Sequence, residues 1–253
     1  MGRVALLVLS FGAACGVTFT GGEPDEAGGG QAGDATGGAP AGSPGGAPAG
    51  SPGGAPAGSP GGSAGAGGGM GGTGGVDDVG CSDGTREGFL DIGTHPDIAA
   101  CDGGWSIPGL VPPTMPQCGR VSGNSSANPD GSGCAADDLC APGWEICASK
   151  DAVAQSSPTD CESADPSGDG FYATRQSGTG ANSCAPTGTD DLFGCGSLGF
   201  GPNSTCDPLD AAGANMCEQL PETWYCGDAP NAVEAELVTK ASAADGGVLC
   251  CRR

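Results

Sequence analysis

The chain has 253 residues, among them 53 Gly, 21 Pro and 15 Cys, and it carries 30 acidic against 8 basic side chains. This negative charge repels phosphate backbones and anionic bilayers, which argues against nucleic acid as a partner and against a peripheral membrane helix. The Gly and Pro content is typical of low-complexity sequence. Because most of the excess Gly lies before residue 80, we expect one disordered tract and one folded region.

The first fourteen residues have the layout of an export signal. Arg3 precedes a short apolar run at 4–11, and three small residues follow at 12–14. A basic start, a short apolar middle and a small-residue cleavage site are typical of a secretory signal peptide. We therefore predict a signal peptide over residues 1–14. The apolar run is shorter than the ~20 residues of a membrane-spanning helix.

Cys15 directly follows these small residues. Small residues followed by Cys resemble the signal of bacterial lipoproteins, in which the peptide is cut before the Cys and the Cys is acylated. The resemblance implies a lipid at Cys15 and, because Gly16 rather than Asp follows it, an outer-membrane or cell-surface location. The family prefers Leu where Gly12 stands. Gly12 and Ala14 also fit the cleavage site of ordinary secretion, so a secreted protein is the alternative.

Residues 15–80 read as a lipid-anchored disordered linker. The octapeptide GGAPAGSP occurs three times without change, at 37–44, 45–52 and 53–60. It has no side chain larger than Pro, so it cannot bury a core. A Gly-rich coil of this length spans roughly 40–50 Å, which suits a spacer that holds a domain away from a membrane. A repeat expansion without any role would have the same physical properties.

Residues 81–253 hold every remaining cysteine. With Cys15 assigned to a lipid, the others are even in number and dense enough for a disulfide scaffold. No pair has the short C-x2-C spacing of a zinc site. We predict disulfides formed in an extracytoplasmic, oxidising compartment. The cysteines are Cys81, Cys101, Cys118, Cys134, Cys140, Cys147, Cys161, Cys184, Cys195, Cys206, Cys217, Cys226, Cys250 and Cys251.

The first half of this region predicts short elements between long loops. Residues 86–93 read as a short strand, whereas 104–113 is apolar but broken by Pro, as in an edge strand or loop. The segment 121–134 has the composition of a loop. A strand is expected at 144–147. A short helix should follow it, because Ser149 is a good N-cap residue with an acid two positions later.

The second half predicts strands and one further helix. Residues 170–178 have the strongest strand pattern in the chain. An Asp-Pro pair at 207–208 is typical of a helix start. The segment after residue 235 reads as two strands about a turn at 245–247, with a helix over 230–240 as the alternative for its first part. The region is therefore expected to be a small, loop-rich α+β domain stapled by disulfides.

The neighbouring residues Cys250 and Cys251 fall in the last of these strands. Successive side chains on a strand point to opposite faces. A bond between adjacent cysteines is badly strained, so each should pair with a different partner, one on either side of the strand.

Part of this framework resembles C-type-lectin-like domains. A Cys before Gly-Trp, a nearby second Cys, a short helix closed by Cys and a last strand ending in Cys are similar to the frame of that family. The family's acidic and Asn ligand motif and its Trp-rich second half have no counterpart here. An unrelated small secreted fold is the alternative. The matching residues are Cys140, Gly143, Trp144, Cys147, Cys161 and Cys250.

A catalytic set is not evident. His95 is the single histidine and lies in a turn-like GTHPD string, so we expect a surface residue. The adjacent acids Asp137–Asp138 and Asp190–Asp191 could serve as a glycosidase pair. Such pairs in loops are usually solvated turn residues, so no residue is assigned to catalysis.

Calcium is the one cofactor that the sequence suggests. Asp165, Ser167 and Asp169 match ligand positions 1, 3 and 5 of an EF-hand-type loop. Gln176 stands where the bidentate Glu belongs, and a plain turn is the alternative explanation. No other metal site is predicted.

These observations favour a surface-exposed or secreted lipoprotein whose disulfide-rich domain binds a glycan or protein ligand. A secreted hydrolase with an unrecognised carboxylate pair is one alternative, and a structural component of the cell surface is another.

Overall fold

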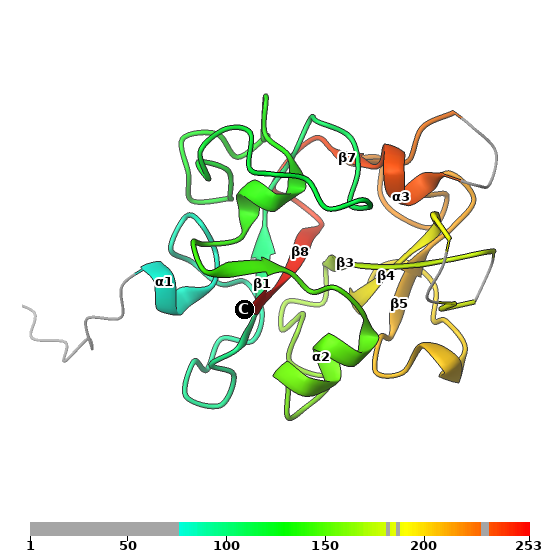
Figure 1. Ribbon diagram of the computed structural model, residues 1–253, viewed down its shortest axis with the longest axis horizontal. Helices are drawn as coiled ribbons and strands as arrows, with labels where there is room; N and C mark the ends of the chain where they lie inside the picture. Colours follow the sequence, from blue (N-terminus) through cyan, green and yellow to red (C-terminus); the bar gives the residue numbers. More distant parts are fainter. Residues whose placement is uncertain (1–75, 181–182, 186–187, 229–232) are drawn as a thin grey trace, which may run out of the picture. The chain divides into compact units, whose positions relative to one another are not determined.

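The computed structural model describes residues 76–180, 183–185, 188–228 and 233–253 (Figure 1). The predicted signal peptide at 1–14, Cys15 and the linker up to residue 75 lie outside the described residues. The regular structure of the described part is mostly β-sheet, with few and short helices. None of these helices is long and apolar enough to cross a bilayer.

One six-stranded sheet organises the described residues (Figure 1). Its path runs β1-β8-β3-β4-β5, and β2 also pairs with β8. The strands are β1 (Ile98–Asp102), β2 (Trp144–Ile146), β3 (Phe171–Gly178), β4 (Asp190–Gly196), β5 (Ala211–Gly213) and β8 (Gly246–Arg252). A separate pair is formed by β6 (Trp224–Tyr225) and β7 (Thr239–Lys240).

The strand β8 lies at the centre of the sheet. One of its edges pairs antiparallel with β1 along five residue positions. Its other edge pairs parallel with β3 near Gly246 and antiparallel with β2 near Arg252. Gly246 has φ +96°, and a Cβ atom there would lie 2.2 Å from the carbonyl oxygen of Phe171. Only glycine therefore allows β3 to approach the start of β8 so closely.

Both faces of the sheet are buried. Val248 and Cys250 face one core, and Leu249 and Cys251 face the other. The first core holds the three tryptophans, and the second holds Phe89 among other apolar side chains. A strand covered on both faces needs a continuous apolar run rather than alternation, which explains the sequence VLCC in β8.

All cysteines of the described chain are paired, so the prediction of a disulfide-rich domain is confirmed. Cys250 bonds to Cys140 in the first core, and Cys251 bonds to Cys147 in the second. The expected pairing on opposite sides of the last strand is therefore found. The seven disulfides are Cys81–Cys101, Cys118–Cys134, Cys140–Cys250, Cys147–Cys251, Cys161–Cys195, Cys184–Cys206 and Cys217–Cys226.

The helices are short. The expected helix after Ser149 is α2 (Lys150–Ser156), and the Ser149 side chain accepts a hydrogen bond from the N–H of Ala152. The alternative of a helix within 230–240 is also found, as α3 (Glu234–Leu237). The others are α1 (Val76–Val79) and the 3-10 turns η1 (Ala136–Leu139) and η2 (Ser204–Cys206).

Two expectations were wrong. The predicted strand 86–93 forms only an isolated bridge at Gly88, because Phe89 has φ +55° and turns the chain away. The helix expected from 207–208 is instead the strand β5, which pairs with β4. The two strands expected about the turn at 245–247 are found as β7 and β8, and β7 pairs with β6.

Candidate functional site

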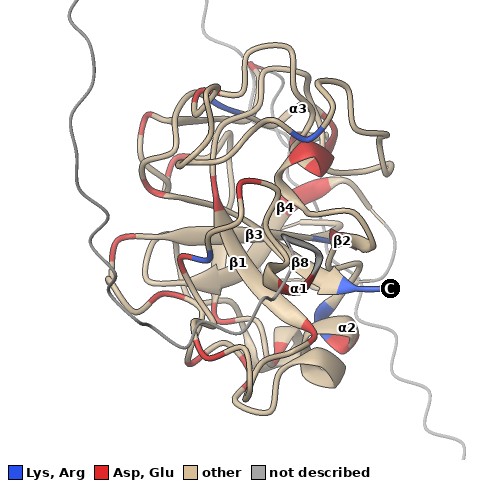
Figure 2. Ribbon diagram, turned by 90° about the vertical axis from the view of Figure 1, so that its left-hand side faces the viewer, with Lys and Arg blue, Asp and Glu red and all other residues tan. Residues whose placement is uncertain are grey.

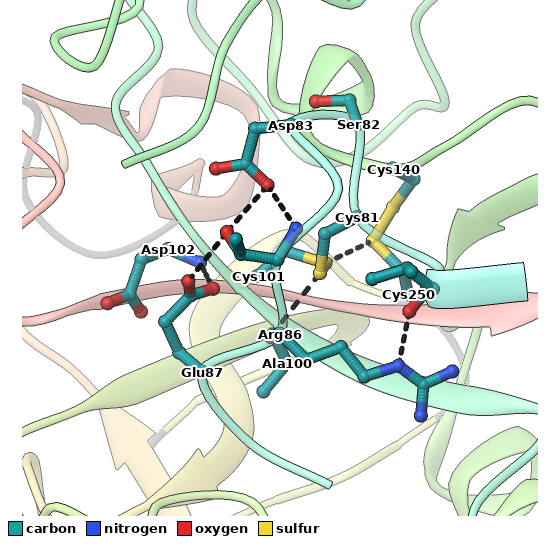
Figure 3. Close-up of a disulfide and its surroundings, with 12 residues drawn as sticks. Cys81, Ser82, Asp83, Arg86, Glu87, Ala100, Cys101, Asp102, Cys140 and Cys250 are labelled. Carbon is teal, nitrogen blue, oxygen red and sulfur yellow. Dashed lines mark hydrogen bonds between the residues drawn. A yellow bond between two sulfur atoms is a disulfide. The ribbon is translucent and has the colours of Figure 1, made fainter. Parts of the chain in front are cut away.

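Acidic side chains gather where β1 ends (Figure 3). Asp102 is the last residue of β1, and Glu87 lies beside it because the Glu87 N–H donates to the carbonyl oxygen of Ala100 at 3.0 Å. The Asp102 N–H in turn donates to Glu87 Oε2 at 2.8 Å. Asp83 lies close by, hydrogen-bonded to Thr85 at 3.0 Å. We call Asp83, Glu87 and Asp102 the β1 acidic cluster.

Protons are held unusually tightly in this cluster. Burial raises the pKa of Glu87 to about 7, and the charges of Asp102 and Asp83 act in the same direction. Burial also raises the pKa of Asp102 to about 6, against a hydrogen bond from Tyr172 and the charge of Lys240. In the described chain Asp102 Oδ1 is buried without a hydrogen-bond partner. Two carboxylates that titrate near neutrality can act as general acid and base.

Two buried side chains from other strands border the β1 acidic cluster. Tyr172 of β3 is hydrogen-bonded to Asp102, and burial raises the pKa of its hydroxyl, so it remains protonated. Burial lowers the pKa of Lys240 in β7 to about 8. The Lys240 Nζ donates to the carbonyl oxygens of Ser242 and Ala244, which hold it in place.

A pocket of about 210 Å³ lies between the loops at 90–95 and 163–166. Its volume is below the range of drug-sized ligand sites, about 300–1,000 Å³, so it suits a single side chain or sugar ring. Leu90, which lines the pocket, is 59% exposed, and Ile92, two residues later in the same loop, is 41% exposed. The pocket is lined by Leu90, Asp91, His95, Ser163 and Pro166.

His95 is buried and not a surface residue, which corrects the expectation from its turn-like sequence. Its ring packs edge-on against Phe89, with centroids 5.1 Å apart. Arg86 holds this loop by donating to the carbonyl oxygens of Phe89 and His95 at 3.0 and 2.7 Å. Burial lowers the pKa of His95 below its usual value, so the ring is neutral at pH 7. This imidazole forms part of the pocket wall.

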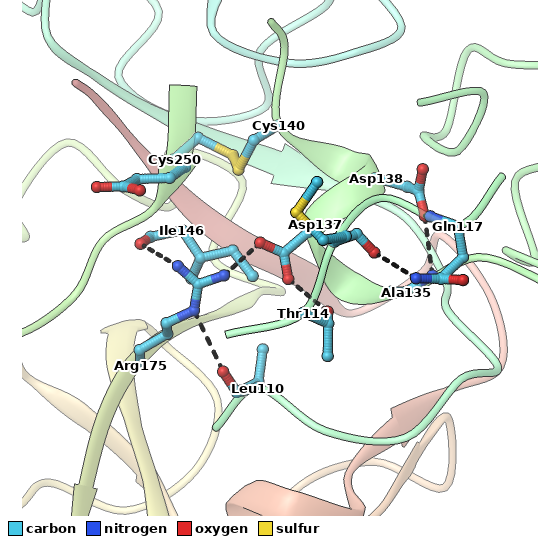
Figure 4. A network of polar contacts seen from close by, with 12 residues as sticks. Leu110, Thr114, Gln117, Ala135, Asp137, Asp138, Cys140, Ile146, Arg175 and Cys250 are labelled. Carbon is cyan, nitrogen blue, oxygen red and sulfur yellow. Dashed lines mark hydrogen bonds and ion pairs between the residues drawn. A yellow bond between two sulfur atoms is a disulfide. The ribbon is translucent and has the colours of Figure 1, made fainter. Parts of the chain in front are cut away.

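The first predicted carboxylate pair, Asp137–Asp138, is buried in a structural network (Figure 4). Asp137 forms an ion pair with Arg175 of β3 and accepts from Thr114 at 2.7 Å. Asp138 accepts hydrogen bonds from the backbone N–H groups at 117, 118, 120 and 135, at 2.8–3.3 Å. Four backbone donors to the Asp138 carboxylate hold the 117–120 loop against η1. Both aspartates of this pair therefore have a structural role.

The second predicted pair, Asp190–Asp191, opens β4. Asp191 is 2% exposed and Asp190 is half-buried. The structure brings Glu234, the first residue of α3, next to them. Burial raises the pKa of Glu234, and the charge of Asp190 adds to this effect.

The predicted calcium loop at 165–169 is a compact turn. Asp165 accepts hydrogen bonds from the N–H groups of Gly168 and Gly170 at 2.9 Å, and from the hydroxyls of Ser167 and Ser197 at 3.0 and 2.7 Å. Burial raises the pKa of Asp165, but these hydrogen bonds outweigh it and hold the pKa below its usual value. Calcium would have to displace these donors, and its binding at Asp165, Ser167 and Asp169 stays a prediction.

No protein-family model matches the chain, and no solved structure shows significant similarity to it.

The β1 acidic cluster was not found from the sequence. Glu87 and Asp102 are fifteen positions apart and belong to no motif. Only the pairing of Gly88 with Ala100 brings them together. No strand was predicted at 98–102, so there was no basis in the sequence for expecting this pairing.

Proposed function

We propose that the chain is an extracytoplasmic, surface-tethered lipoprotein. In this proposal residues 1–14 are a signal peptide, Cys15 carries the lipid, and a disordered linker to residue 80 precedes a single α+β domain at 81–253. The seven disulfides support the location, because such bonds persist in oxidising compartments.

The domain binds a protein ligand at the pocket beside Leu90. The observation that carries this proposal is the exposure of Leu90 in a pocket that a single apolar side chain would fill, with the exposed Ile92 two residues later in the same loop. Large apolar side chains exposed together mark interaction sites more often than isolated ones do.

The charge of the domain favours a basic partner. Figure 2 shows acidic positions spread over many loops, with few basic positions between them. A ligand that places Lys or Arg around one apolar side chain would be attracted over a long range and then held by burial of that side chain. The lectin-like resemblance favours a glycan, but the described lining of this pocket holds no exposed aromatic face for a sugar ring to stack on. It consists of Leu90, Asp91, Ser163, Pro166 and the buried ring of His95.

An array of basic peptides, each with one central apolar residue, tests this proposal beside a glycan array. Wild-type protein should retain the peptides in low salt, and Leu90→Asp should weaken retention at least tenfold. Met115→Asp is the matched control, because Met115 is 74% exposed and lies outside the pocket. Equal loss in both variants, or retention only of glycans, would contradict a protein ligand at this pocket. Retention of neither class would favour a structural component of the cell surface.

Metabolic labelling tests the anchor separately. An alkyne fatty acid should label the wild-type chain and not Cys15→Ser. Equal labelling of both chains would remove the lipid from the proposal and leave the secreted alternative.

The raised pKa values of Glu87 and Asp102 favour a second candidate, an acid–base hydrolase. Glu87 would donate or accept the proton, and Asp102, held by Tyr172, would act as its partner carboxylate. Turnover on a panel of polysaccharides and peptides that is lost in Glu87→Gln and kept in Glu162→Gln would establish it. Absence of turnover on the whole panel would count against it.

A further inference from the structure

Three carboxylates from two separate elements meet at the start of β4. Asp190 and Asp191 belong to β4, and Glu234 begins α3. One oxygen from each lies within 4.8 Å of the other two. The elements are fixed to one another, since the N–H of Ala235 donates to the carbonyl oxygen of Thr189 at 2.9 Å. The packing of α3 against β4 therefore holds the three carboxylates close together.

Glu234 supplies a second, separate observation. Its side chain is fully buried, and Oε2 has no hydrogen-bond partner in the described part of the chain. Its other oxygen, Oε1, accepts a hydrogen bond from the N–H of Met216, and the backbone of Asp191 also donates to the Glu234 carboxylate. None of the ion pairs in the described chain involves Glu234. A buried carboxylate oxygen without a donor is costly, so it calls for a proton or a cation.

The geometry fits a cation. Calcium binds oxygen ligands at 2.3–2.6 Å, so oxygens that touch one ion lie up to about 5 Å apart. The donor set is carboxylate only, which selects hard divalent cations over zinc or copper. We propose that Asp190, Asp191 and Glu234 form a site for one divalent cation of the calcium class. The ion would join α3 to β4 and satisfy Glu234 Oε2.

This site is distinct from the loop that the sequence suggested for calcium. The oxygens of Asp165 already accept several N–H and O–H donors, whereas Oε2 of Glu234 has no hydrogen-bond partner among the described residues. Moderate affinity is expected, because three protein carboxylates leave the remaining positions to water or carbonyl oxygens. Extracellular calcium modules of this kind have dissociation constants of about 0.1–1 mM.

The test is calorimetric titration of CaCl₂ into the full, oxidised chain after treatment with EDTA and dialysis. Wild-type protein should bind one ion per chain, and Glu234→Gln should weaken binding at least tenfold. Because Glu234 is buried, Asp190→Asn provides a second variant at a half-buried position that folding tolerates better, and it should also weaken binding. Asp169→Asn is the control and should bind as the wild type does.

Two results would overturn the proposal. Absence of heat at 10 mM calcium would rule out a calcium site at these carboxylates. Binding that survives Glu234→Gln and Asp190→Asn but is lost in Asp169→Asn would place the ion in the 165–169 turn instead.

Discussion

Cys250 and Cys251 are neighbours on β8, yet their disulfides lie in different cores and close nearly the same stretch of chain. Cys140–Cys250 spans 110 residues and Cys147–Cys251 spans 104. When one of the two is intact, the other closes an additional loop of only about eight residues. The two bonds are thus largely redundant as constraints on the unfolded chain.

Removing both bonds should therefore cost more than the sum of the single removals. The chain-entropy relation gives about 2.5 kcal/mol for a loop of about eight residues and about 4.7 kcal/mol for one of about 100. We expect about 2–3 kcal/mol from Cys140→Ala with Cys250→Ala, or from Cys147→Ala with Cys251→Ala, and about 7 kcal/mol from all four changes. Guanidinium unfolding of the oxidised proteins measures this, and additivity within about 0.5 kcal/mol would contradict redundancy.

The buried ion pair of Arg175 and Asp137 should be essential for stability. Arg175→Met leaves Asp137 charged and uncompensated in the interior, so we expect a loss of about 3–5 kcal/mol. Changing Asp137→Leu as well should recover part of that loss. The control is Arg253→Met, whose pair with Glu145 is exposed to solvent and which should change stability by less than about 1 kcal/mol in urea unfolding. A small effect of Arg175→Met would contradict this role.

Stability should fall as the pH rises through the titration of the β1 acidic cluster. The unfolded chain ionises Glu87 and Asp102 near their ordinary values of 4.5 and 3.8, whereas the folded chain holds these protons to about pH 7 and 6. Between about pH 4 and 7 the folded state therefore binds more protons, and raising the pH destabilises it.

Glu87→Gln tests this pH dependence. The amide can still accept the hydrogen bond from Asp102 but has no charge to bury. We expect a gain of about 1–2 kcal/mol at pH 8, after allowance for partial exposure, and no change at pH 4. Urea unfolding at both values measures it, with the exposed Glu162→Gln as control. A gain of the same size at both pH values would contradict the titration.

The stability of helix α2 should depend on its N-cap residue, Ser149. Ser149→Ala removes the hydroxyl that accepts from the Ala152 N–H, at a cost of about 1 kcal/mol. The same substitution at Ser156, within the helix, should be neutral or slightly stabilising, because Ala has the higher helix propensity. Equal thermal shifts for the two variants would show that the cap is dispensable.

Local signals predicted some elements correctly. Ser149 and Asp151 marked the start of α2, and the apolar, aromatic run at 171–173 marked β3. The strand β1 has the sequence IAACD, in which Ala and Asp are depleted in strands. It forms because β8 pairs along its whole length and both of its faces are buried. The alanines at 211–212 likewise form strand β5 because they pair with β4.

The candidate polar sites were likewise predicted only in part. Adjacent acids were visible in the sequence, but their surroundings were not: one pair is locked by Arg175 and four backbone donors, and the other meets Glu234 more than forty positions later. The β1 acidic cluster was missed because Glu87 and Asp102 are joined only through long-range pairing. Residue type thus identified candidate groups, and tertiary contacts decided their roles.

The central position of β8 limits when the native disulfides of this chain can form. Every other strand precedes β8 in the chain, so during synthesis β1, β2 and β3 are made before the strand that joins them. Cys140 and Cys147 must wait for partners more than a hundred residues later, while other thiols are already present. Oxidation in order of emergence would pair them wrongly. The native bonds of these two cysteines therefore form only after β8 has been made, or through thiol–disulfide exchange that corrects earlier pairings.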